Sequence, residues 1–499
     1  MEILFENIKS ILVANDLLVK CSKKSISSFH SLQNNTALIK KNDIYIALTG
    51  GKNNGHDFIP QAIEKGAECL IVEEETKVSA LLPYFVVHNT RAAWSVLSAS
   101  IHGNPEKQLK LYGVTGTDGK TSTVWMTSEL IRKSHSNCLS IGTLGITDGT
   151  NRWSIDHTTP DPPVLFSAFA HALKTGIRNV IMEVSSHSLI QEKLRNLNFE
   201  ATAFTSFSRD HLDFHSSMEE YLDAKCLLFK KHIKKDSKIF ICDKVLNLLP
   251  LDTFTSSNIC TYGNKSKSSF EHMSILENRA GKEGQLIKIK IRDQILEGEI
   301  PYIGSHNVEN FLAALLFAEN ILGFIPKPEI WMTLTPVPGR CELIKIDKPT
   351  IKTFVDFAHT PKGLETTLST LRSYTKGKLW VVFGCGGNRD RGKRPEMAKI
   401  AEMLADHLII TSDNPRDERP EDIIKDIQSG LSKIDPSRVT TIIKRDEAIK
   451  FVINKAQKKD TILIAGKGHE GFQIIGTKKI PFSDQEHARK FLKEKNELE

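Results

Sequence analysis

Leu109–Ser122 reads LKLYGVTGTDGKTS, and this stretch decides how the middle of the chain folds. Its first residues have the composition of a strand, a glycine-rich turn follows, and helical periodicity runs from Lys120 to about Lys133. Glycines let backbone N–H groups face phosphate oxygens, the helix N-terminus adds partial positive charge, and the lysine reaches the β and γ phosphates. The stretch is a short G-x-x-G-K-T form, with Val114 where the strict eight-residue pattern has glycine. The alternative is a glycine-rich turn with an exposed lysine, but the order of strand, loop and helix favours a nucleotide-binding loop.

Apolar β-rich runs alternate with helical periodicity along most of the chain, which predicts α/β folds with largely parallel sheets. With 499 residues, about three domains are expected. We predict a small N-terminal α/β unit over 1–107 and a central P-loop NTPase-like sheet with helices over 108–337. A C-terminal doubly wound, Rossmann-like sheet is predicted over 338–499, with ligands at the carboxyl ends of its strands. Its five strands are expected at Thr353–Phe357, Leu379–Phe383, His407–Thr411, Thr440–Ile443 and Thr461–Ala465.

Composition and charge exclude several classes of protein. The chain is 40% hydrophobic and 25% charged, which excludes collagen-like, coiled-coil and wholly disordered classes. The net charge of +7 suits an anionic partner, but basic clusters such as Lys230–Lys235 are short and lack aromatic residues. A solvated surface therefore explains them better than nucleic-acid binding. No apolar run reaches transmembrane length, no signal peptide is visible, and the eight cysteines form no CxxC pair. We expect a cytoplasmic monomer with no membrane insertion, no disulfide framework and no zinc site.

Acidic and histidine side chains follow later predicted strands. Glu183 ends the strand Val180–Val184, and Asp210 and His211 follow the strand Ala201–Thr205. If these strands are neighbours of the phosphate loop, such groups together with the hydroxyl of Thr121 suit Mg²⁺ beside a triphosphate. The nearby Asp213 or His215 could instead cap the next helix. Lys225, beside an apolar run in Met218–Lys231, would ordinarily be a surface residue.

Ten motifs occur in order over about 350 residues, so chance similarity is implausible. The motifs are GTDGKT, MEVSSH, SRDHLDFH, YLDAK, GSHNVENFLAA, VPGR, VDFAHTP, FGCGGNRDRGKRPEM, DNPR and AGKGHE. They resemble the Mur ligases of bacterial cell-wall synthesis, and within them the ligases that extend a UDP-N-acetylmuramoyl-dipeptide by one amino acid.

The resemblance implies an ATP-dependent amide ligase of peptidoglycan synthesis that acts through an acyl phosphate. It assigns UDP binding to the N-terminal unit, ATP to the centre and the amino acid to the C-terminal domain. It makes Lys120, Glu183, His211 and Lys225 catalytic. It also implies two Mg²⁺ ions, one on Thr121 and Glu183, the other on His211 and a carbamylated Lys225. Nucleotide contacts are implied for Gly116, Thr117, Asp118, Gly119, Lys120, Thr121, Ser122, Asn307, Arg340 and Asp356.

The substrate UDP-MurNAc-L-Ala-D-Glu is implied to meet the chain in both of its first two domains. The sequence departs from the family here, because Asn35-Thr36-Ala37 stands where relatives have Asp-Ser-Arg. Asp118 and His157 both stand where asparagine is frequent, and Lys193 stands where arginine is expected, which keeps the charge but loses the bidentate fork. The implied contacts are Thr36, His157, Thr158, Thr159, Ser185, Gln191 and Lys193.

Two arginines in loops after successive C-terminal strands suit carboxylate recognition, and Glu470 suits an ammonium. meso-Diaminopimelate has a second carboxylate that lysine lacks, and an arginine at the position of Arg416 in DNPR resembles the motif of the diaminopimelate-adding enzymes. Our hypothesis is therefore that the amino acid added is meso-diaminopimelate. The alternative for Arg416 is a surface ion pair with Asp417 or Glu418. The implied amino-acid contacts are Arg389, Asp413, Asn414, Pro415, Arg416, Gly466 and Glu470.

Competing hypotheses remain from the sequence. The nearest are a lysine-adding sibling and a ligase related to folylpolyglutamate synthase; the DNPR and GHE motifs argue against both. A P-loop NTPase that couples hydrolysis to binding or movement would release phosphate without an amino acid. A nucleic-acid-binding protein would show steeply salt-dependent binding.

Overall fold

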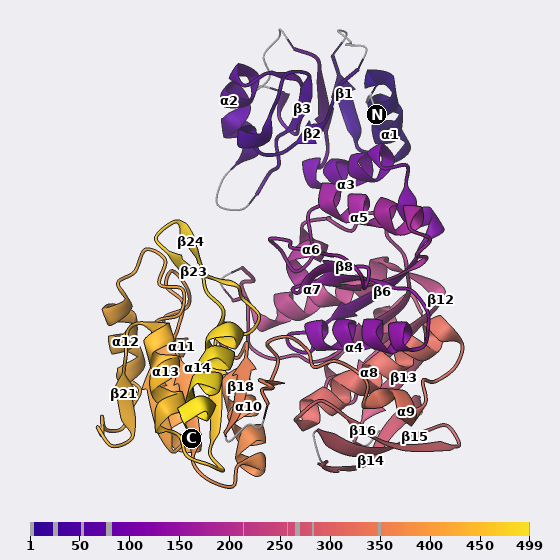
Figure 1. Cartoon of the computed structure of the whole chain (residues 1–499). Helices are drawn as coiled ribbons and strands as arrows, with labels where there is room; N and C mark the ends of the chain where they lie inside the picture. Colours follow the sequence, from indigo (N-terminus) through magenta and orange to yellow (C-terminus); the bar gives the residue numbers. More distant parts are fainter. Residues whose placement is uncertain are drawn as a thin grey trace. The chain divides into compact units, whose positions relative to one another are not determined.

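The structure is a computed structural model that describes residues 4–22, 28–50, 54–75, 82–212, 214–256, 258–264, 270–281, 284–347 and 351–498. The chain divides into two compact units (Figure 1). The first unit comprises residues 1–262, 266–272 and 313–325, and the second comprises 263–265, 273–312 and 326–499. The predicted boundaries after residues 107 and 337 stay predictions.

The N-terminal part of the first unit is a five-stranded sheet with the order β1-β5-β4-β3-β2. Strands β2 to β5 are parallel, and β1 pairs antiparallel with β5. One apolar core lies between the sheet and helices α1 and α3, and a second lies under α2. The elements are α1 (Phe5–Ala14), β1 (Leu18–Cys21), β2 (Leu32–Gln33), β3 (Asp43–Ile46), α2 (Ile59–Glu64), β4 (Ala67–Val72), β5 (Tyr84–Val87) and α3 (Thr90–Ile101).

The central part of the first unit is a sheet in which β13, β12, β11, β6, β10 and β7 lie side by side and run parallel. The carboxyl ends of β6, β10 and β11 therefore meet at one edge, as the sequence predicted. Strands β8 and β9 extend the sheet antiparallel beyond β7. The elements are β6 (Lys110–Thr115), α4 (Lys120–Lys133), β7 (Leu139–Gly142), β8 (Gly145–Thr147), β9 (Arg152–Trp153), α5 (Pro162–Lys174), β10 (Asn179–Glu183), α6 (Ser186–Ile190), β11 (Phe199–Phe204), α7 (Met218–Lys231), β12 (Ile233–Cys242) and β13 (Ile259–Gly263).

An antiparallel meander precedes Pro301 and consists of β14 (Glu271–Ala280), β15 (Gln285–Ile291) and β16 (Gln294–Ile300). The long apolar run near Phe311 is the helix α8 (Ser305–Leu322), whose middle residues are buried. Among the described residues, no helix is both long and apolar enough to cross a membrane. The short helix α9 (Pro328–Trp331) follows.

The C-terminal sheet is doubly wound, which confirms the predicted fold class. Its order is β17-β18-β22-β19-β20-β21, and all strands are parallel except the edge strand β17. Helices α10, α11 and α12 pack on one face and α13 and α14 on the other. A hairpin of β23 and β24 follows the last parallel strand. The elements are β17 (Glu342–Leu343), β18 (Lys352–Asp356), α10 (Pro361–Tyr374), β19 (Leu379–Phe383), α11 (Lys393–Leu404), β20 (His407–Ile410), α12 (Pro420–Gln428), β21 (Val439–Thr441), α13 (Arg445–Lys455), β22 (Thr461–Ala465), β23 (Phe472–Ile475), β24 (Lys478–Pro481) and α14 (Asp484–Leu498).

Candidate active site

The predicted phosphate loop lies between β6 and α4. Gly116 has a φ of +146°, and a Cβ there would lie 2.1 Å from the Thr205 hydroxyl oxygen. Gly119 caps α4 with a φ of +89°. The residues that follow β11 hold the loop in place, because the Thr205 and Ser206 hydroxyls donate to the Asp118 carbonyl at 2.6 and 3.0 Å. Both glycines are thus required for the loop to present the N-terminus of α4 to an anion.

Two lysines converge on this loop. Lys120 Nζ donates to the carbonyls of Gly116 at 2.8 Å and Thr117 at 2.7 Å. Lys225 Nζ, from α7, donates to the same Gly116 carbonyl at 2.7 Å and lies 4.4 Å from the centre of the Tyr221 ring. Lys225 is only 1% exposed, so the expectation of a surface lysine is wrong. Burial, and then the charge of Lys120, hold the pKa of Lys225 well below its ordinary value.

Glu183 lies at the end of β10 and is buried beside the first turn of α4. The Thr121 hydroxyl donates to Glu183 Oε2 at 3.0 Å, and the backbone N–H of Thr143 donates to Oε1 at 2.7 Å. A Cβ at Gly142 would lie 2.1 Å from Oε1, so the carboxylate occupies a space that only glycine leaves open. The structure therefore brings together Thr121 and Glu183, which are 62 residues apart in the sequence.

Histidines gather beside Tyr221. The His211 ring centre lies 5.9 Å from that of Tyr221 and 5.0 Å from that of His187, and its backbone has a φ of +53°. His215 is buried and shares a hydrogen bond of 3.0 Å with the Ser186 hydroxyl. The cap of α7 is Ser217, so His215 does not cap that helix, and Asp213 lies outside the described residues. Among the described residues, no group of three or more His, Cys, Asp or Glu side chains is arranged to hold a metal ion.

The predicted muramyl-peptide residues lie around the start of α6. The Thr159 hydroxyl donates to the Glu183 carbonyl at 2.9 Å and to Ser185 Oγ at 3.3 Å, and Ser185 caps α6. Lys193 is buried and forms an ion pair with Asp161 at 2.6 Å. The remaining predicted residues are Thr158, whose hydroxyl lies 3.1 Å from that of Thr143; Gln191 at the end of α6; exposed His157; and Thr36, which donates to Gln61 Oε1 at 2.8 Å.

Three predicted nucleotide residues lie in the second unit. Asp356, at the end of β18, accepts hydrogen bonds from the N–H of Cys341 at 2.6 Å and of Ala358 at 2.8 Å. The Arg340 guanidinium stacks 4.4 Å from the centre of the Phe357 ring. The side chain of Asn307, in α8, is buried and donates to the Ile303 carbonyl at 2.8 Å.

Arg416 is half-buried in the loop after β20, and the group that it forms with Arg389, Asp413, Asn414 and Glu470 is called the Arg416 pocket below. Its φ is +51°, and its backbone pairs with the β23–β24 hairpin through Ile474 O and Gly476 N. Its guanidinium donates to the Gly387 carbonyl at 2.8 Å. Burial and the nearby Arg389 lower the pKa of Arg416. The alternative of a surface pair with Glu418 is wrong, because Arg394 engages that carboxylate through two hydrogen bonds of 2.9 Å.

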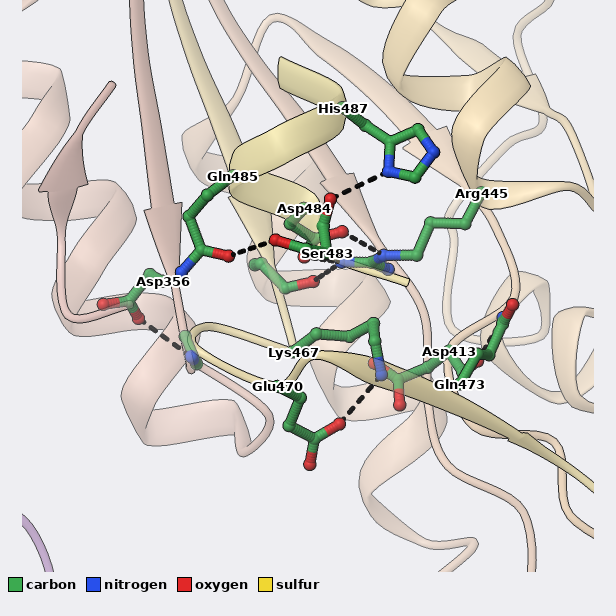
Figure 2. Close-up of polar contacts among 12 residues, drawn as sticks. Asp356, Asp413, Arg445, Lys467, Glu470, Gln473, Ser483, Asp484, Gln485 and His487 are labelled. Atoms are coloured by element: carbon green, nitrogen blue, oxygen red, sulfur yellow. Dashed lines mark hydrogen bonds and ion pairs between the residues drawn. The ribbon is translucent and has the colours of Figure 1, made fainter. Parts of the chain in front are cut away.

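Glu470 and Asn414 belong to the same group of side chains, and Figure 2 shows Glu470 in contact with Lys467. Asn414 Nδ2 donates to Glu470 Oε2 at 2.9 Å, and Lys467 Nζ donates to the same oxygen at 2.8 Å. A Cβ at Gly466 would lie 2.7 Å from Asp413 Oδ2, and the Pro415 carbonyl lies against Gly387, so these backbones are close-packed.

The sequence reasoning missed three fully buried cations of the second unit. Arg394 pairs with Glu418 and Asp426, Arg445 pairs with Asp484, and Lys467 pairs with Glu470. Arg394 and Lys467 lie within the quoted motifs, but nothing in the sequence distinguishes a buried arginine or lysine from an exposed one.

Comparison with known proteins gives matches over almost the whole chain. A family model described as the Mur ligase middle domain matches residues 114–318, the Mur ligase glutamate ligase domain matches 339–468, and the Mur ligase family catalytic domain matches 28–110. The UDP-N-acetylmuramoyl-L-alanyl-D-glutamate–2,6-diaminopimelate ligase of Bacillus velezensis is 36% identical over 475 residues, which covers 93% of this chain and 94% of the relative. The enzyme of the same name from Bacillus licheniformis is 38% identical over 474 residues, which covers 93% and 94%.

Solved structures give the same picture. A structure of a UDP-N-acetylmuramoyl-L-alanyl-D-glutamate–2,6-diaminopimelate ligase aligns with a TM-score of 0.67 and 30% identity, covering 99% of this chain and 100% of that chain. MurF ligase from Thermotoga maritima in complex with ADP aligns with a TM-score of 0.64 and covers 94% of this chain and 99% of its own, but at 16% identity it shows the fold alone.

Proposed function

The chain belongs to the Mur ligase family, and on that premise we propose that it joins meso-diaminopimelate to the D-glutamyl carboxylate of UDP-MurNAc-L-Ala-D-Glu at the expense of ATP. The observation that carries the choice of amino acid is the pocket of Arg416. There the side chains of Arg416 and Arg389 both lie against Gly386, since a Cβ at that glycine would be 2.9 Å from Arg416 Nη1 and 3.7 Å from Arg389 Cγ. Asn414, two residues before Arg416, donates to the Glu470 carboxylate at 2.9 Å. Two cationic forks and one carboxylate complement a far end that bears both a carboxylate and an ammonium.

The proposed ligation proceeds in two steps, formation of an acyl phosphate and then of the amide. A carboxylate oxygen of the D-glutamyl residue attacks the γ-phosphorus of ATP, the bond to the bridging oxygen breaks, and ADP leaves. The amine nitrogen of diaminopimelate then attacks the acyl carbon, loses a proton, and expels inorganic phosphate. Both reactants of the first step are anions, so catalysis depends chiefly on positioned cations.

Lys120 and the loop amides supply part of this charge for the β and γ phosphates. Lys120 Nζ already lies on the loop, where it donates to the carbonyls of Gly116 and Thr117. A triphosphate in the loop gives this ammonium a stronger, charged acceptor. Asn307, Arg340 and Asp356 are the proposed further nucleotide contacts.

The chemistry of the side chains beside the loop fits Mg²⁺. The hydroxyl of Thr121 and the buried carboxylate of Glu183 are hard oxygen donors in hydrogen-bonding contact, and this ion prefers such ligands. When bound, Mg²⁺ would neutralise charge on the transferred phosphoryl group. Glu183 is held by the N–H of Thr143 as well, so its carboxylate is oriented before any ion arrives.

Lys225 fits carbamylation. A buried ammonium beside Lys120 is unfavourable, which promotes the neutral amine, and a neutral amine adds CO₂ with loss of a proton. The N–C bond formed turns a cationic side chain into an anionic oxygen donor. Together with His211, the carbamate would hold the second Mg²⁺.

The proposed contacts with the muramyl peptide are His157, Thr158, Thr159, Ser185, Gln191 and Lys193. Thr36 is the proposed contact with the uridine part of the substrate. The ion pair of Lys193 with Asp161 supports a fixed cation in this region, in the place where arginine is expected.

One experiment tests the proposal. Phosphate release is measured with ATP, Mg²⁺ and UDP-MurNAc-L-Ala-D-Glu against a panel of amino acids. We expect a response to meso-diaminopimelate alone. A response to L-lysine would move the assignment to the sibling activity, and indifference to every amino acid would refute a ligase. We also propose that the protein is a cytoplasmic monomer. Light scattering on the purified enzyme measures its molar mass and so tests whether it is a monomer.

A further inference from the structure

Lys467 lies in the loop after β22 and is fully buried although it carries an ammonium group. Its Nζ donates to Glu470 Oε2 at 2.8 Å, a contact visible in Figure 2. Nζ also donates to Asn414 Oδ1 at 3.0 Å and lies 6.0 Å from the centre of the Phe472 ring. Burial of a charge is unfavourable unless partners compensate it, and the ion pair with Glu470 supplies that compensation.

The contacts of Lys467 orient the other polar groups of the pocket. The Asn414 amide is fixed from both ends, because Oδ1 accepts from Lys467 Nζ and from the N–H of Ile474, while Nδ2 donates to Glu470 Oε2. Lys467 and Asn414 therefore hold the same carboxylate oxygen. Within the described chain, the other oxygen, Oε1, has no hydrogen-bond donor and is left to accept an incoming ammonium.

Lys467 also neutralises Glu470. The two groups form an ion pair at 2.8 Å, in which the ammonium is fully buried. Without Lys467, the Glu470 carboxylate would keep Asn414 as a hydrogen-bond donor but would lose its counter-charge. The far end of diaminopimelate is a zwitterion with no net charge, whereas the far end of lysine is a lone cation. A compensated Glu470 therefore attracts a lone cation weakly, and an uncompensated Glu470 would attract it more strongly.

We propose that Lys467 is a specificity-determining positioning residue. Its buried charge offsets Glu470, so the pocket accepts an amino acid whose far end bears a carboxylate and rejects one whose far end bears only an ammonium. This inference rests on the proposed function. In the proposed function, Arg416 attracts the carboxylate of diaminopimelate. Lys467 is a second specificity residue, which acts against lysine as a competing substrate.

The test uses the full-length enzyme and compares kcat/KM for meso-diaminopimelate with kcat/KM for L-lysine. The neutral variants are Lys467→Met and Lys467→Gln, and Lys467→Arg keeps the charge. Lys478→Met, on the exposed face of β24, is the matched control for loss of a lysine. Both substrates report on the same active molecules, so their ratio does not depend on the fraction of a variant that folds.

We expect the preference for diaminopimelate over lysine to fall by at least about tenfold in both neutral variants, since the counter-charge that lies 2.8 Å from Glu470 is removed. Lys467→Arg and Lys478→Met should keep the wild-type ratio. An unchanged ratio in the neutral variants, or loss of both activities in both of them, would overturn the proposal. A wild-type enzyme that does not use diaminopimelate would instead refute the proposed function, so the two failures are distinguishable.

Discussion

The ion pair of Arg445 and Asp484 offers the sharpest test of the energetics of the C-terminal unit. Both side chains are completely buried, and the guanidinium donates from Nε to Oδ1 at 2.8 Å and from Nη2 to Oδ2 at 2.7 Å (Figure 2). Nη2 also donates to the carbonyl of Ala465, the last residue of β22, at 2.9 Å. Asp484→Ala would leave a buried guanidinium without its counter-charge.

The expected loss follows from that burial. Removal of one partner from a buried, hydrogen-bonded ion pair costs about 3–5 kcal/mol, because the remaining charge cannot regain water. Asp484 also opens α14, where an acidic side chain adds a smaller contribution of about 0.3–1 kcal/mol from the helix dipole. Since about 1.4 kcal/mol corresponds to a factor of ten, the opening equilibrium of β22 should rise by more than about 100-fold.

Hydrogen exchange measured on the full-length protein reports this change at the amides of β22. The matched control is Glu447→Ala, which removes the exposed partner of Lys444, 2.9 Å away in the same unit. Exposed pairs contribute about 0–1 kcal/mol, so the control should leave protection of β22 nearly unchanged. If Asp484→Ala lost no more protection than this control, the reasoning from burial would be refuted.

Three further outcomes are expected. Glu183→Gln should lower kcat by about 100-fold or more with little change in stability, because the negative charge beside Thr121 is lost while the shape is kept; steady-state kinetics and thermal unfolding measure the two effects. Lys225→Ala should abolish turnover, and short carboxylic acids should restore part of it by replacing the carbamate oxygens, as a rescue series would show. The pKa of Glu418 is lowered from 4.5 to about 2, chiefly by its hydrogen bond with Arg394. Because the native carboxylate has the lower pKa, its stabilisation is complete above about pH 4.5 and is lost as the pH falls through about 2. Urea unfolding should therefore show a steeper acid loss in the wild type than in Glu418→Gln, and equal slopes would contradict the assignment.

The sequence predicted the fold well wherever the signal was local. Period-2 and period-3.6 patterns located the helix Lys120–Lys133 at its observed bounds and the five parallel strands of the C-terminal sheet to within about two residues. The edge strand β17 and the hairpin β23–β24 were not predicted, because strands of two to four residues are too short to show a period-2 pattern of hydrophobic residues. The phosphate loop could be predicted because its strand, its glycine-rich turn and its helix follow one another directly in the sequence.

Of the groups that act through tertiary contacts, Lys225 was singled out only by resemblance. Lys225 lies beside an apolar run, and its burial arises only when α7 packs against the Gly116 carbonyl. The meeting of Thr121 with Glu183 was predicted from the residues on the condition that their strands are neighbours, and the parallel pairing of β6 with β10 meets that condition.

The buried cations of the C-terminal unit share one arrangement. Arg394 donates to the Gly386 carbonyl, Arg445 to the Ala465 carbonyl, and Lys467 to Glu470, so each fixes a loop that follows a parallel strand. A loop at the carboxyl edge of a sheet has few backbone partners of its own, and a buried charge that is costly to leave unpaired restricts the positions that the loop can take. If the proposed amino-acid site is right, we expect its precision to depend on these buried charges as well as on the side chains that meet the substrate. The overall excess of +7 says little about these loops, because each of the three buried cations is paired with at least one carboxylate.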